Sequence, residues 1–280
     1  AGAALTAHRG VAKLAFTGSA EVGRIVAHAG AERLVPVSLE LGGKSPNIVF
    51  PDADNLDGVV DNALFAATYC NGQSCLAGTR LFVHEDIYGR FVDKLCAAAA
   101  RLKVGDALDA QAHLSCLVSQ RQGERVLGYI DTGRAEGARL LHGGGRIAVP
   151  GGEAGWFVAP TLFEARNDMR IAQEEIFGPV LSILRWSDHA QMLREANDVR
   201  YGLAAGIYTA SLDNAMRTAE ALQAGSVWIN HYFNLNSGAP FGGYKESGIG
   251  REHCRETLQM YSQVKSITVQ NRVADPWFAV

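Results

Sequence analysis

Short apolar runs alternate along the chain with longer segments in which apolar residues recur every three or four positions. The short runs predict strands at residues 14–16, 34–39, 47–50, 80–83, 180–184, 206–208 and 226–229. The longer segments predict helices at residues 21–32, 56–69, 87–102 and 121–134, and near 191–196 and 213–222. Strands that alternate with helices are typical of an α/β fold.

Two further segments break this alternation. The glycine-rich stretch at residues 143–152 predicts a hairpin or surface loop and not a phosphate cradle, because no helical pattern follows it. Residues 264–269 alternate apolar and polar side chains, which predicts a strand with one covered face. Such a strand is either an edge strand of its own domain or one that needs a pairing partner.

The composition narrows the class of protein. With 280 residues, of which 48% are hydrophobic and 20% charged, the chain can bury a sizeable core in one large or two ordinary domains. The net charge of −3, without any basic block, does not favour nucleic acid or an anionic membrane as a partner. The five cysteines show neither a CxxC pair nor spacing for zinc, so we expect no metal centre and a reducing, cytoplasmic setting.

A thiol and a carboxylate are the candidate reactive groups. Cys75 ends the run Asn-Gly-Gln-Ser-Cys, in a loop just beyond the predicted helix at 56–69, and Glu40 ends the predicted strand at 34–39 before Leu-Gly-Gly-Lys. A thiol can attack a carbonyl carbon and a carboxylate can activate water, which suits a covalent thioester route. For the thiolate to form at neutral pH, we expect backbone N–H groups of the turn to supply positive potential.

Each of these residues also has an ordinary structural interpretation. A single cysteine is more often a small buried hydrophobic residue than a nucleophile. Glu40 can instead hydrogen-bond backbone amides of the turn that follows it. Gly18 and Ser19 follow a short strand and open a helix, where free N–H groups and the helix dipole can meet a phosphate, but Ser19 can equally be a plain N-cap.

Five segments, in the same order, resemble the aldehyde dehydrogenase superfamily. They are Phe-Thr-Gly-Ser-Ala-Glu-Val-Gly at 16–23, Glu-Leu-Gly-Gly-Lys-Ser-Pro-Asn at 40–47, Asn-Gly-Gln-Ser-Cys at 71–75, Glu-Glu-Ile-Phe-Gly-Pro-Val at 174–180 and Pro-Phe-Gly-Gly-Tyr-Lys-Glu-Ser-Gly at 240–248. The resemblance covers almost the whole chain but only the carboxyl-terminal part of a family member. Because the chain also starts without methionine, we expect a fragment of a longer protein.

The resemblance implies a domain organisation and a set of site residues. Residues 1–42 would be the remnant of a Rossmann-type coenzyme domain, 43–250 an α/β catalytic domain, and 251–280 a carboxyl-terminal helix with an oligomerisation strand. The implied nucleophile is Cys75 and the implied base is Glu40. The implied cofactor-binding residues are Gly18, Ser19, Gly23, Leu41, Gly42, Gln122, Glu175 and Phe177.

Three of the residues with implied roles also have ordinary structural interpretations. Glu175 would accept hydrogen bonds from ribose hydroxyls, and Phe177 would flank the nicotinamide ring; a surface glutamate and a core phenylalanine are the alternatives. Phe241 would line the substrate tunnel, although an aromatic residue before two glycines is also ordinary core packing.

The implied activity is oxidation of a small aldehyde to a carboxylic acid, with hydride transfer to NAD or NADP and NAD favoured. The route would pass through a thiohemiacetal and a thioester on Cys75, which water activated by Glu40 would hydrolyse. In the resembled family the segment that corresponds to 264–269 helps form a sheet that crosses between subunits, so the resemblance implies a homo-oligomer, either a dimer or a tetramer. The alternatives are a relative that passes the thioester to coenzyme A, which Glu40 disfavours, and an inactive homologue with a binding or structural role.

Overall fold

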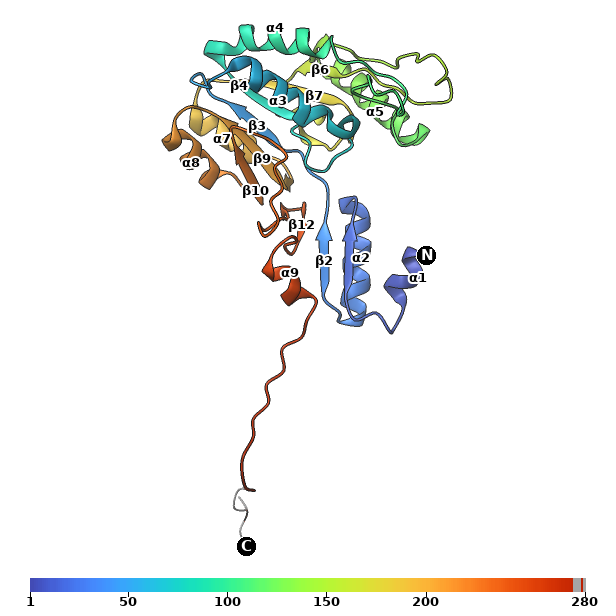
Figure 1. Cartoon of the computed structure of the whole chain (residues 1–280), viewed down its shortest axis with the longest axis vertical. Helices are drawn as coiled ribbons and strands as arrows, with labels where there is room; N and C mark the ends of the chain where they lie inside the picture. The colour runs from blue at the N-terminus through green and yellow to red at the C-terminus, as the bar shows by residue number, and fades with distance from the viewer. Residues whose placement is uncertain (274–277, 279–280) are drawn as a thin grey trace.

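A parallel sheet of seven strands forms the larger part of the molecule (Figure 1). The computed structural model describes residues 1–273 and 278. The strand order is β10 (Ser226–Ile229), β9 (Ala204–Tyr208), β3 (Pro46–Val49), β4 (Arg80–His84), β7 (Val180–Trp186), β6 (Thr161–Glu164) and β5 (Arg139–His142). Only β5 runs antiparallel to its neighbour. The short apolar runs that form these strands fit a sheet whose two faces are both covered.

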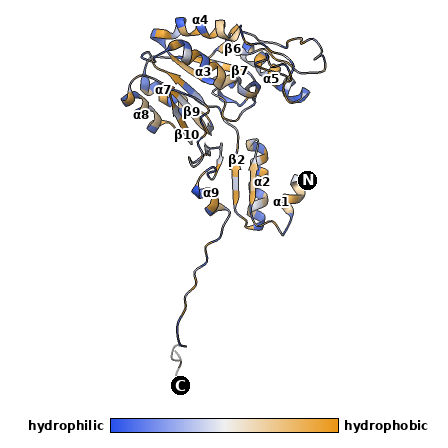
Figure 2. Ribbon diagram, viewed as in Figure 1, coloured by the Kyte–Doolittle hydropathy of each residue, from blue (hydrophilic) through white to orange (hydrophobic). Residues whose placement is uncertain are grey.

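Helices cover both faces of this sheet. The helices are α3 (Leu56–Thr68), α4 (Tyr88–Ala99), α5 (Gln120–Ala135), α6 (Arg170–Gln173), α7 (His189–Asn197) and α8 (Leu212–Ala221). The first two pack on side chains such as Val49 and Leu81. The other four pack on the opposite face, on neighbours such as Ile48, Phe82 and Phe163. Figure 2 shows hydrophobic residues gathered in the strands of this sheet and where the helices meet it.

A small sheet lies beside the large one and carries the first part of the chain (Figure 1). Its strands are β1 (Leu14–Thr17), β2 (Val37–Glu40) and β12 (Gly248–Ile249), with β1 parallel and β12 antiparallel to β2. Helix α2 (Ala20–Arg33) connects β1 to β2 and packs on Leu14 and Leu39. The sheet therefore joins residues near both ends of the chain, and the domain division at 42 and 250 stays a prediction.

Shorter elements complete the described chain. They are α1 (Gly2–Ala7), α9 (Arg255–Met260), the 3₁₀ turns η1 (Tyr69–Gly72) and η2 (Glu85–Ile87), and the strand pair β8 (Tyr201–Gly202) and β11 (Tyr244–Lys245). In the stretch predicted as a surface loop, Gly143 and Gly144 have φ values of 69° and 96°. Arg146 forms an antiparallel bridge with Val158, and no helix follows directly. That prediction is confirmed.

The α/β fold class predicted from the alternating pattern is confirmed, with two corrections to the elements. The strand predicted at 34–39 begins only at Val37, because Leu34 ends α2 in a left-handed conformation (φ 52°) with its side chain in solvent. The helix predicted at 87–102 covers only Tyr88–Ala99, after the 3₁₀ turn.

The carboxyl-terminal tail differs most from the prediction. Residues 264–269 form no strand and pair with no other segment of the described chain (Figure 1). Their apolar side chains are in solvent, with Val264 fully exposed and Ile267 78% exposed. The interpretation as an edge strand of the chain's own domain is therefore wrong, whereas pairing with a second copy stays a prediction. Residues 274–277, 279 and 280 of the predicted 251–280 segment lie outside the described residues.

Arg80 is the largest fully buried side chain of the structure. Its guanidinium donates hydrogen bonds to the carbonyl oxygens of Lys44 (2.9 Å), Glu195 (3.0 Å) and Ala196 (2.6 Å), and to Oδ1 of Asn167 (3.1 Å). It thereby ties the turn before β3 to the carboxyl end of α7.

Replacing Arg80 with methionine should lower the free energy of unfolding by about 3 kcal/mol or more, because several buried acceptors would lose their donor at once. Urea denaturation followed by circular dichroism measures this loss. The exposed Arg90 offers a control, and Arg90→Met should change stability by about 0.5 kcal/mol or less. Equal stability of the two variants would contradict the structural role of Arg80.

Candidate active site

Glu40 is the last residue of β2 and lies where the small sheet meets the large one. Its carbonyl oxygen accepts a hydrogen bond from the Gly18 N–H (3.0 Å), and its backbone pairs with Gly248 of β12 on the other side. The side chain is 5% exposed, and its Oε2 atom has no hydrogen-bond partner among the described residues. The alternative in which this carboxylate bonds amides of the following turn is not observed.

Burial raises the pKa of the Glu40 carboxyl to about 8. The nearby Glu252 raises this pKa further, and Arg251 opposes both effects. At neutral pH the carboxyl therefore holds a proton in most molecules, and the carboxylate becomes available as a base as the pH passes about 8. A buried carboxyl with an unpartnered oxygen is well suited to take a proton from water.

The turn after Glu40 is shaped by two glycines. A Cβ atom on Gly43 would collide with the carbonyl oxygen of Cys75, and one on Gly42 would collide with the Glu175 carboxylate. Oε1 of Glu175 accepts a hydrogen bond from the Gly43 N–H (3.1 Å). Only glycine permits such close approach, so the Leu-Gly-Gly sequence brings the segments of Cys75 and Glu175 against the turn that Glu40 begins.

Cys75 follows a strained turn at the end of α3. Cys70, Asn71 and Gly72 all have positive φ values, of 52°, 60° and 67°. The Asn71 side chain holds this turn, since it donates to the Cys116 carbonyl oxygen (3.2 Å) and accepts from the Ser115 N–H (2.7 Å). Such strain persists only where the surrounding structure enforces it, and it often occurs at functional sites.

The electrostatic environment of Cys75 differs from the prediction. Burial raises the pKa of the thiol to about 11, and the carboxylates of Glu175 and Glu40 add to this effect. The N–H groups of Cys75 and Leu76 lower the pKa, as expected, but they are outweighed. The predicted effect of the turn N–H groups is therefore present, but it does not bring the pKa of the thiol below its ordinary value. The thiol needs a proton acceptor before it can attack, and Glu40 is one of the two carboxylates that act on it.

Alkylation by iodoacetamide should report this environment directly. Compared with a free cysteine of pKa about 8.5, a thiol of pKa about 11 contains roughly 300-fold less thiolate at pH 7.5. The alkylation rate of Cys75, followed by peptide mass spectrometry, should therefore be low and rise about tenfold per pH unit up to about pH 11. The exposed Cys70 of the same molecule serves as the control. A Cys75 rate that levels off near pH 7 would contradict the raised pKa.

The residues predicted to meet a cofactor phosphate lie at the start of α2. Ser19 is the N-cap of this helix, and its Oγ accepts a hydrogen bond from the Val22 N–H (3.3 Å). Ser19 thus has the plain capping role, and the first N–H groups of the helix remain without an intrahelical acceptor. A Cβ on Gly23 would lie 2.7 Å from a methyl carbon of Leu41, so this glycine lets α2 pack on that side chain. Gly18 is exposed beside them.

The second group of predicted cofactor residues forms a connected loop. Nε2 of Gln122 donates to the carbonyl oxygens of Ile176 (3.0 Å) and Phe177 (2.8 Å). Phe177 has a φ of 61° and keeps 37% of its surface exposed, so it is not the core residue of the alternative interpretation. Burial raises the pKa of Glu175, which is not the surface glutamate of its alternative. Their roles toward a cofactor stay predictions.

Phe241 belongs to the same apolar cluster as Cys75. The cluster also contains Leu203, Trp228 and Tyr232. A cleft of about 350 Å³ opens beside it and is lined by Trp228 and Phe241. The structure therefore places Phe241 and the candidate nucleophile against the same cluster, and the role of Phe241 toward a substrate stays a prediction.

Three residues that act on this site were not predicted from the sequence. Glu252 and Arg251 tune Glu40, and Ser247 holds the glycine turn by accepting from the Leu41 N–H and donating to the Gly42 carbonyl oxygen. All three belong to the segment around β12. A two-residue strand carries no periodic signal, so only the charged pair after Gly-Ile-Gly could have drawn attention to it.

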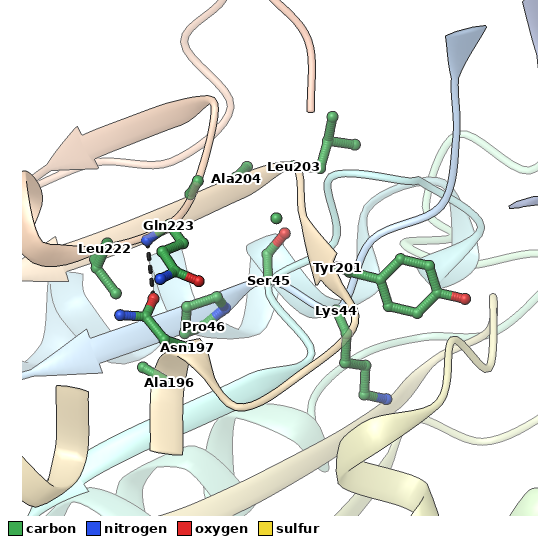
Figure 3. Close-up of a pocket in the computed structure, with 12 residues that line it drawn as sticks. Lys44, Ser45, Pro46, Ala196, Asn197, Tyr201, Leu203, Ala204, Leu222 and Gln223 are labelled. Carbon is green, nitrogen blue, oxygen red and sulfur yellow. Dashed lines mark hydrogen bonds between the residues drawn. The ribbon is translucent and has the colours of Figure 1, made fainter. Parts of the chain in front are cut away.

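A small cavity lies beside Lys44 and Ser45, the residues that follow the glycine turn in the sequence (Figure 3). Its volume is about 10 Å³, its lining includes Lys44, Ser45 and Tyr201, and it has no room for a cofactor. Within residues 1–273 and 278, no group of three His, Cys, Asp or Glu side chains is placed to hold a metal ion. None of the described helices is long and apolar enough to cross a membrane.

The fold and site define an α/β protein with a half-buried thiol and a buried carboxyl at the junction of two sheets. Residues 1–267 match the aldehyde dehydrogenase family, and the chain belongs to that family. It is 47% identical over 272 residues to the mitochondrial aldehyde dehydrogenase of Homo sapiens, with 96% of this chain and 52% of the relative covered. It is 45% identical over 279 residues to the betaine aldehyde dehydrogenase of Brucella anthropi, with 99% and 57% covered.

Solved structures agree with this membership. The NAD⁺ complex of an aldehyde dehydrogenase from Bacillus cereus superimposes with a TM-score of 0.93 at 44% identity, covering 97% of this chain and 54% of that one. A putative aldehyde dehydrogenase from Burkholderia cenocepacia gives a TM-score of 0.95 at 41% identity, with 99% and 57% covered. The chain spans about half the length of the curated relatives it matches.

Proposed function

We propose that this chain carries the catalytic centre of an aldehyde dehydrogenase that oxidises an aldehyde to a carboxylic acid. The main support is the glycine turn, where Gly42 and Gly43 admit the Glu175 carboxylate and the Cys75 backbone next to Glu40. The family membership supports the same chemistry, because each relative named above is an aldehyde dehydrogenase.

In the proposed reaction the Cys75 sulfur attacks the aldehyde carbon while a carboxylate takes the thiol proton. Glu40 is suited to this proton transfer, because its pKa of about 8 is close to the operating pH. The new C–S bond leaves a tetrahedral carbon that bears an oxygen anion and the aldehyde hydrogen. Loss of that hydrogen as hydride restores the C=O bond and leaves a thioester on Cys75.

Hydrolysis of the thioester completes the turnover. Glu40 first releases the thiol proton to solvent and then takes a proton from a water molecule, whose oxygen attacks the thioester carbon. The C–S bond then breaks, the carboxylic acid leaves and Cys75 departs as a thiolate. Burial of the Glu40 carboxyl, together with its unpartnered Oε2, provides the acceptor for the water proton.

Three features fit a dinucleotide cofactor. The first N–H groups of α2, next to the exposed Gly18 and Ser19, can hold a phosphate. The exposed ring of Phe177 can flank the nicotinamide, and Glu175 keeps lone pairs for ribose hydroxyls beyond its bond to Gly43. When bound, the nicotinamide supplies the hydride acceptor. We propose NAD as this cofactor, since a structural neighbour is an NAD⁺ complex.

Aldehyde-dependent formation of reduced cofactor, followed by absorbance, tests the function in a protein that carries this chain. We expect product with NAD⁺ alone and no acceleration by coenzyme A, because Glu40 directs water to the thioester. Acceleration by coenzyme A, with acyl-coenzyme A as the product, would favour the acyl-transferring alternative. Absence of aldehyde oxidation under both conditions would favour the inactive homologue.

We also propose that copies of the chain associate through residues 264–269, as a dimer or tetramer. Val264, Ile267 and Val269 are exposed and are separated by polar residues. As an extended strand, this segment could pair with a strand of a second copy and cover its apolar side chains. Sedimentation should give a larger mass for residues 1–280 than for residues 1–262. Equal masses, both of a monomer, would contradict this assembly. The cytoplasmic setting remains a prediction from the cysteine pattern.

A further inference from the structure

One face of α5 contacts the loop that connects α6 to β7. We call residues 174–178 the bridging loop. Four side chains of α5 meet this loop, and their positions are three or four residues apart, which places them on one side of the helix. We call them the α5 face; they are Gln122, Arg125, Val126 and Tyr129.

Glu174, the first residue of the bridging loop, is fixed by side-chain hydrogen bonds. The Arg170 guanidinium donates to both of its carboxylate oxygens (2.9 and 3.0 Å), and the Tyr129 hydroxyl donates to Oε2 (2.6 Å). The bonds from Arg170 and Tyr129 lower the pKa of the Glu174 carboxyl to about 2, against the effect of burial. Next to them, the Arg125 guanidinium donates to the carbonyl oxygen of Glu175 (2.7 Å).

The rest of the bridging loop lies on the same helix face. Gln122 donates to two consecutive loop carbonyl oxygens, and the second belongs to Phe177. A Cβ atom on Gly178 would collide with a methyl carbon of Val126. Phe177 between them has a left-handed backbone, with a φ of 61°. A bulky residue rarely adopts this conformation, so the contacts with α5 enforce the shape of the loop.

The bridging loop also lies against both parts of the candidate site. A Cβ atom on Gly72, whose φ is 67°, would collide with the carbonyl oxygen of Gly178. Gly72 belongs to the strained turn before Cys75. At the other end of the loop, Glu175 accepts the hydrogen bond from Gly43. Because these approaches are too close for any residue but glycine, a shift of the loop must also move its neighbours.

The segment that leads into α5 holds the strained turn from a second side. The Asn71 side chain bonds two backbone groups of this segment (2.7 and 3.2 Å). Oε1 of Gln73 accepts a hydrogen bond from the Val118 N–H (3.0 Å), directly before the helix. One continuous stretch, residues 115–129, therefore contacts both the turn before the candidate nucleophile and the bridging loop.

We propose that residues 115–129 form a positioning scaffold, which fixes the bridging loop against the turn before Cys75. Within the scaffold, Tyr129 is a positioning residue that acts on the loop through Glu174. Its part in the reaction rests on the proposed function, in which the bridging loop meets the cofactor. The coupling between the loop and the thiol does not depend on catalysis.

Alkylation of Cys75 by iodoacetamide at pH 7.5 tests this coupling on the full chain. Tyr129→Phe removes only the hydroxyl, so the bridging loop should relax. Besides burial, the Glu175 carboxylate raises the pKa of the thiol, and its retreat should increase the alkylation rate several-fold. Thr132→Ala is the matched control, because this hydroxyl of the same helix donates only to the Gly128 carbonyl oxygen within it (2.9 Å). Equal rates in the two variants would overturn the proposal.

Glu174→Gln and the double variant distinguish the scaffold from a general loosening of the structure. Tyr129→Phe and Glu174→Gln weaken the same hydrogen bond, so the rate in the double variant should match that of the faster single variant. Rates that multiply in the double variant would show that Tyr129 does not act through Glu174. If Tyr129→Phe fails to fold, an unchanged rate in Glu174→Gln would overturn the proposal by itself.

Calorimetry with NAD⁺, on a protein that carries this chain, tests the part of the scaffold in the reaction. The affinity should fall several-fold in Tyr129→Phe and stay constant in Thr132→Ala. Faster alkylation with an unchanged affinity in Tyr129→Phe would contradict the positioning role toward the cofactor. Absence of NAD⁺ binding in every variant, with the alkylation differences intact, would count against the proposed function and support the scaffold.

Discussion

Aldehyde-dependent reduction of NAD⁺ should fall to background when Cys75 is replaced by alanine. The substitution removes the only sulfur that packs with Phe241 and Tyr232 in the described apolar cluster, and no other described group there can form the thioester. Cofactor binding should persist, because the helix α2 terminus and the Phe177 loop are separate segments. Absorbance measures turnover, and calorimetry measures the affinity for NAD⁺.

Cys70→Ala provides the matched control for this result. Cys70 is exposed, lies five positions earlier and has no role in the proposed chemistry. We expect it to retain most of the turnover. Substantial turnover in Cys75→Ala, or equal losses in both variants, would contradict the assignment of the nucleophile.

Replacing Glu40 with glutamine should separate the two halves of the reaction. Glutamine keeps the size of the side chain but cannot take a proton from water, so hydrolysis of the thioester should slow by about 10²- to 10⁴-fold. Hydride transfer precedes that step, and in this variant the thiol proton can pass to Glu175, the other carboxylate that acts on Cys75. A burst of reduced cofactor should therefore remain, followed by a slow steady state. Stopped-flow absorbance resolves the two phases.

The pH dependence sharpens this prediction. The raised pKa of Glu40, about 8, means that the base is formed only as the pH rises through that value. Turnover limited by hydrolysis should therefore increase with pH through about 8 in the unmodified protein and lose this dependence in Glu40→Gln. Wild-type turnover in Glu40→Gln would show that Glu40 is structural.

The α/β architecture could be predicted because it rests on local periodicity. Buried parallel strands such as β3 and β4 read as continuous apolar runs, and the helices between them show helical spacing. The start of β2 was misplaced because Leu34 looks like a strand residue, while its left-handed backbone ends α2. The tail at 264–269 has strand periodicity without a partner, and periodicity alone cannot supply one.

The candidate site could be predicted only as a set of residue types. Cys75 and Glu40 stand out by chemistry and by resemblance, and the structure brings their segments together across Gly43. The raised pKa of the thiol could not be predicted, because it depends on how closely Glu175 and Glu40 approach after folding. The same holds for Glu252, which reaches Glu40 through a strand of two residues.

The most direct test of the account is to capture the acyl group on Cys75. The Glu40→Gln variant of a protein that carries this chain would be mixed with an aldehyde and NAD⁺, quenched in acid and digested for peptide mass spectrometry. We predict one acyl group per chain, on the peptide that contains Cys75, and none when NAD⁺ is omitted. An acyl group on another residue, or none on Cys75 during the burst, would contradict the thioester route.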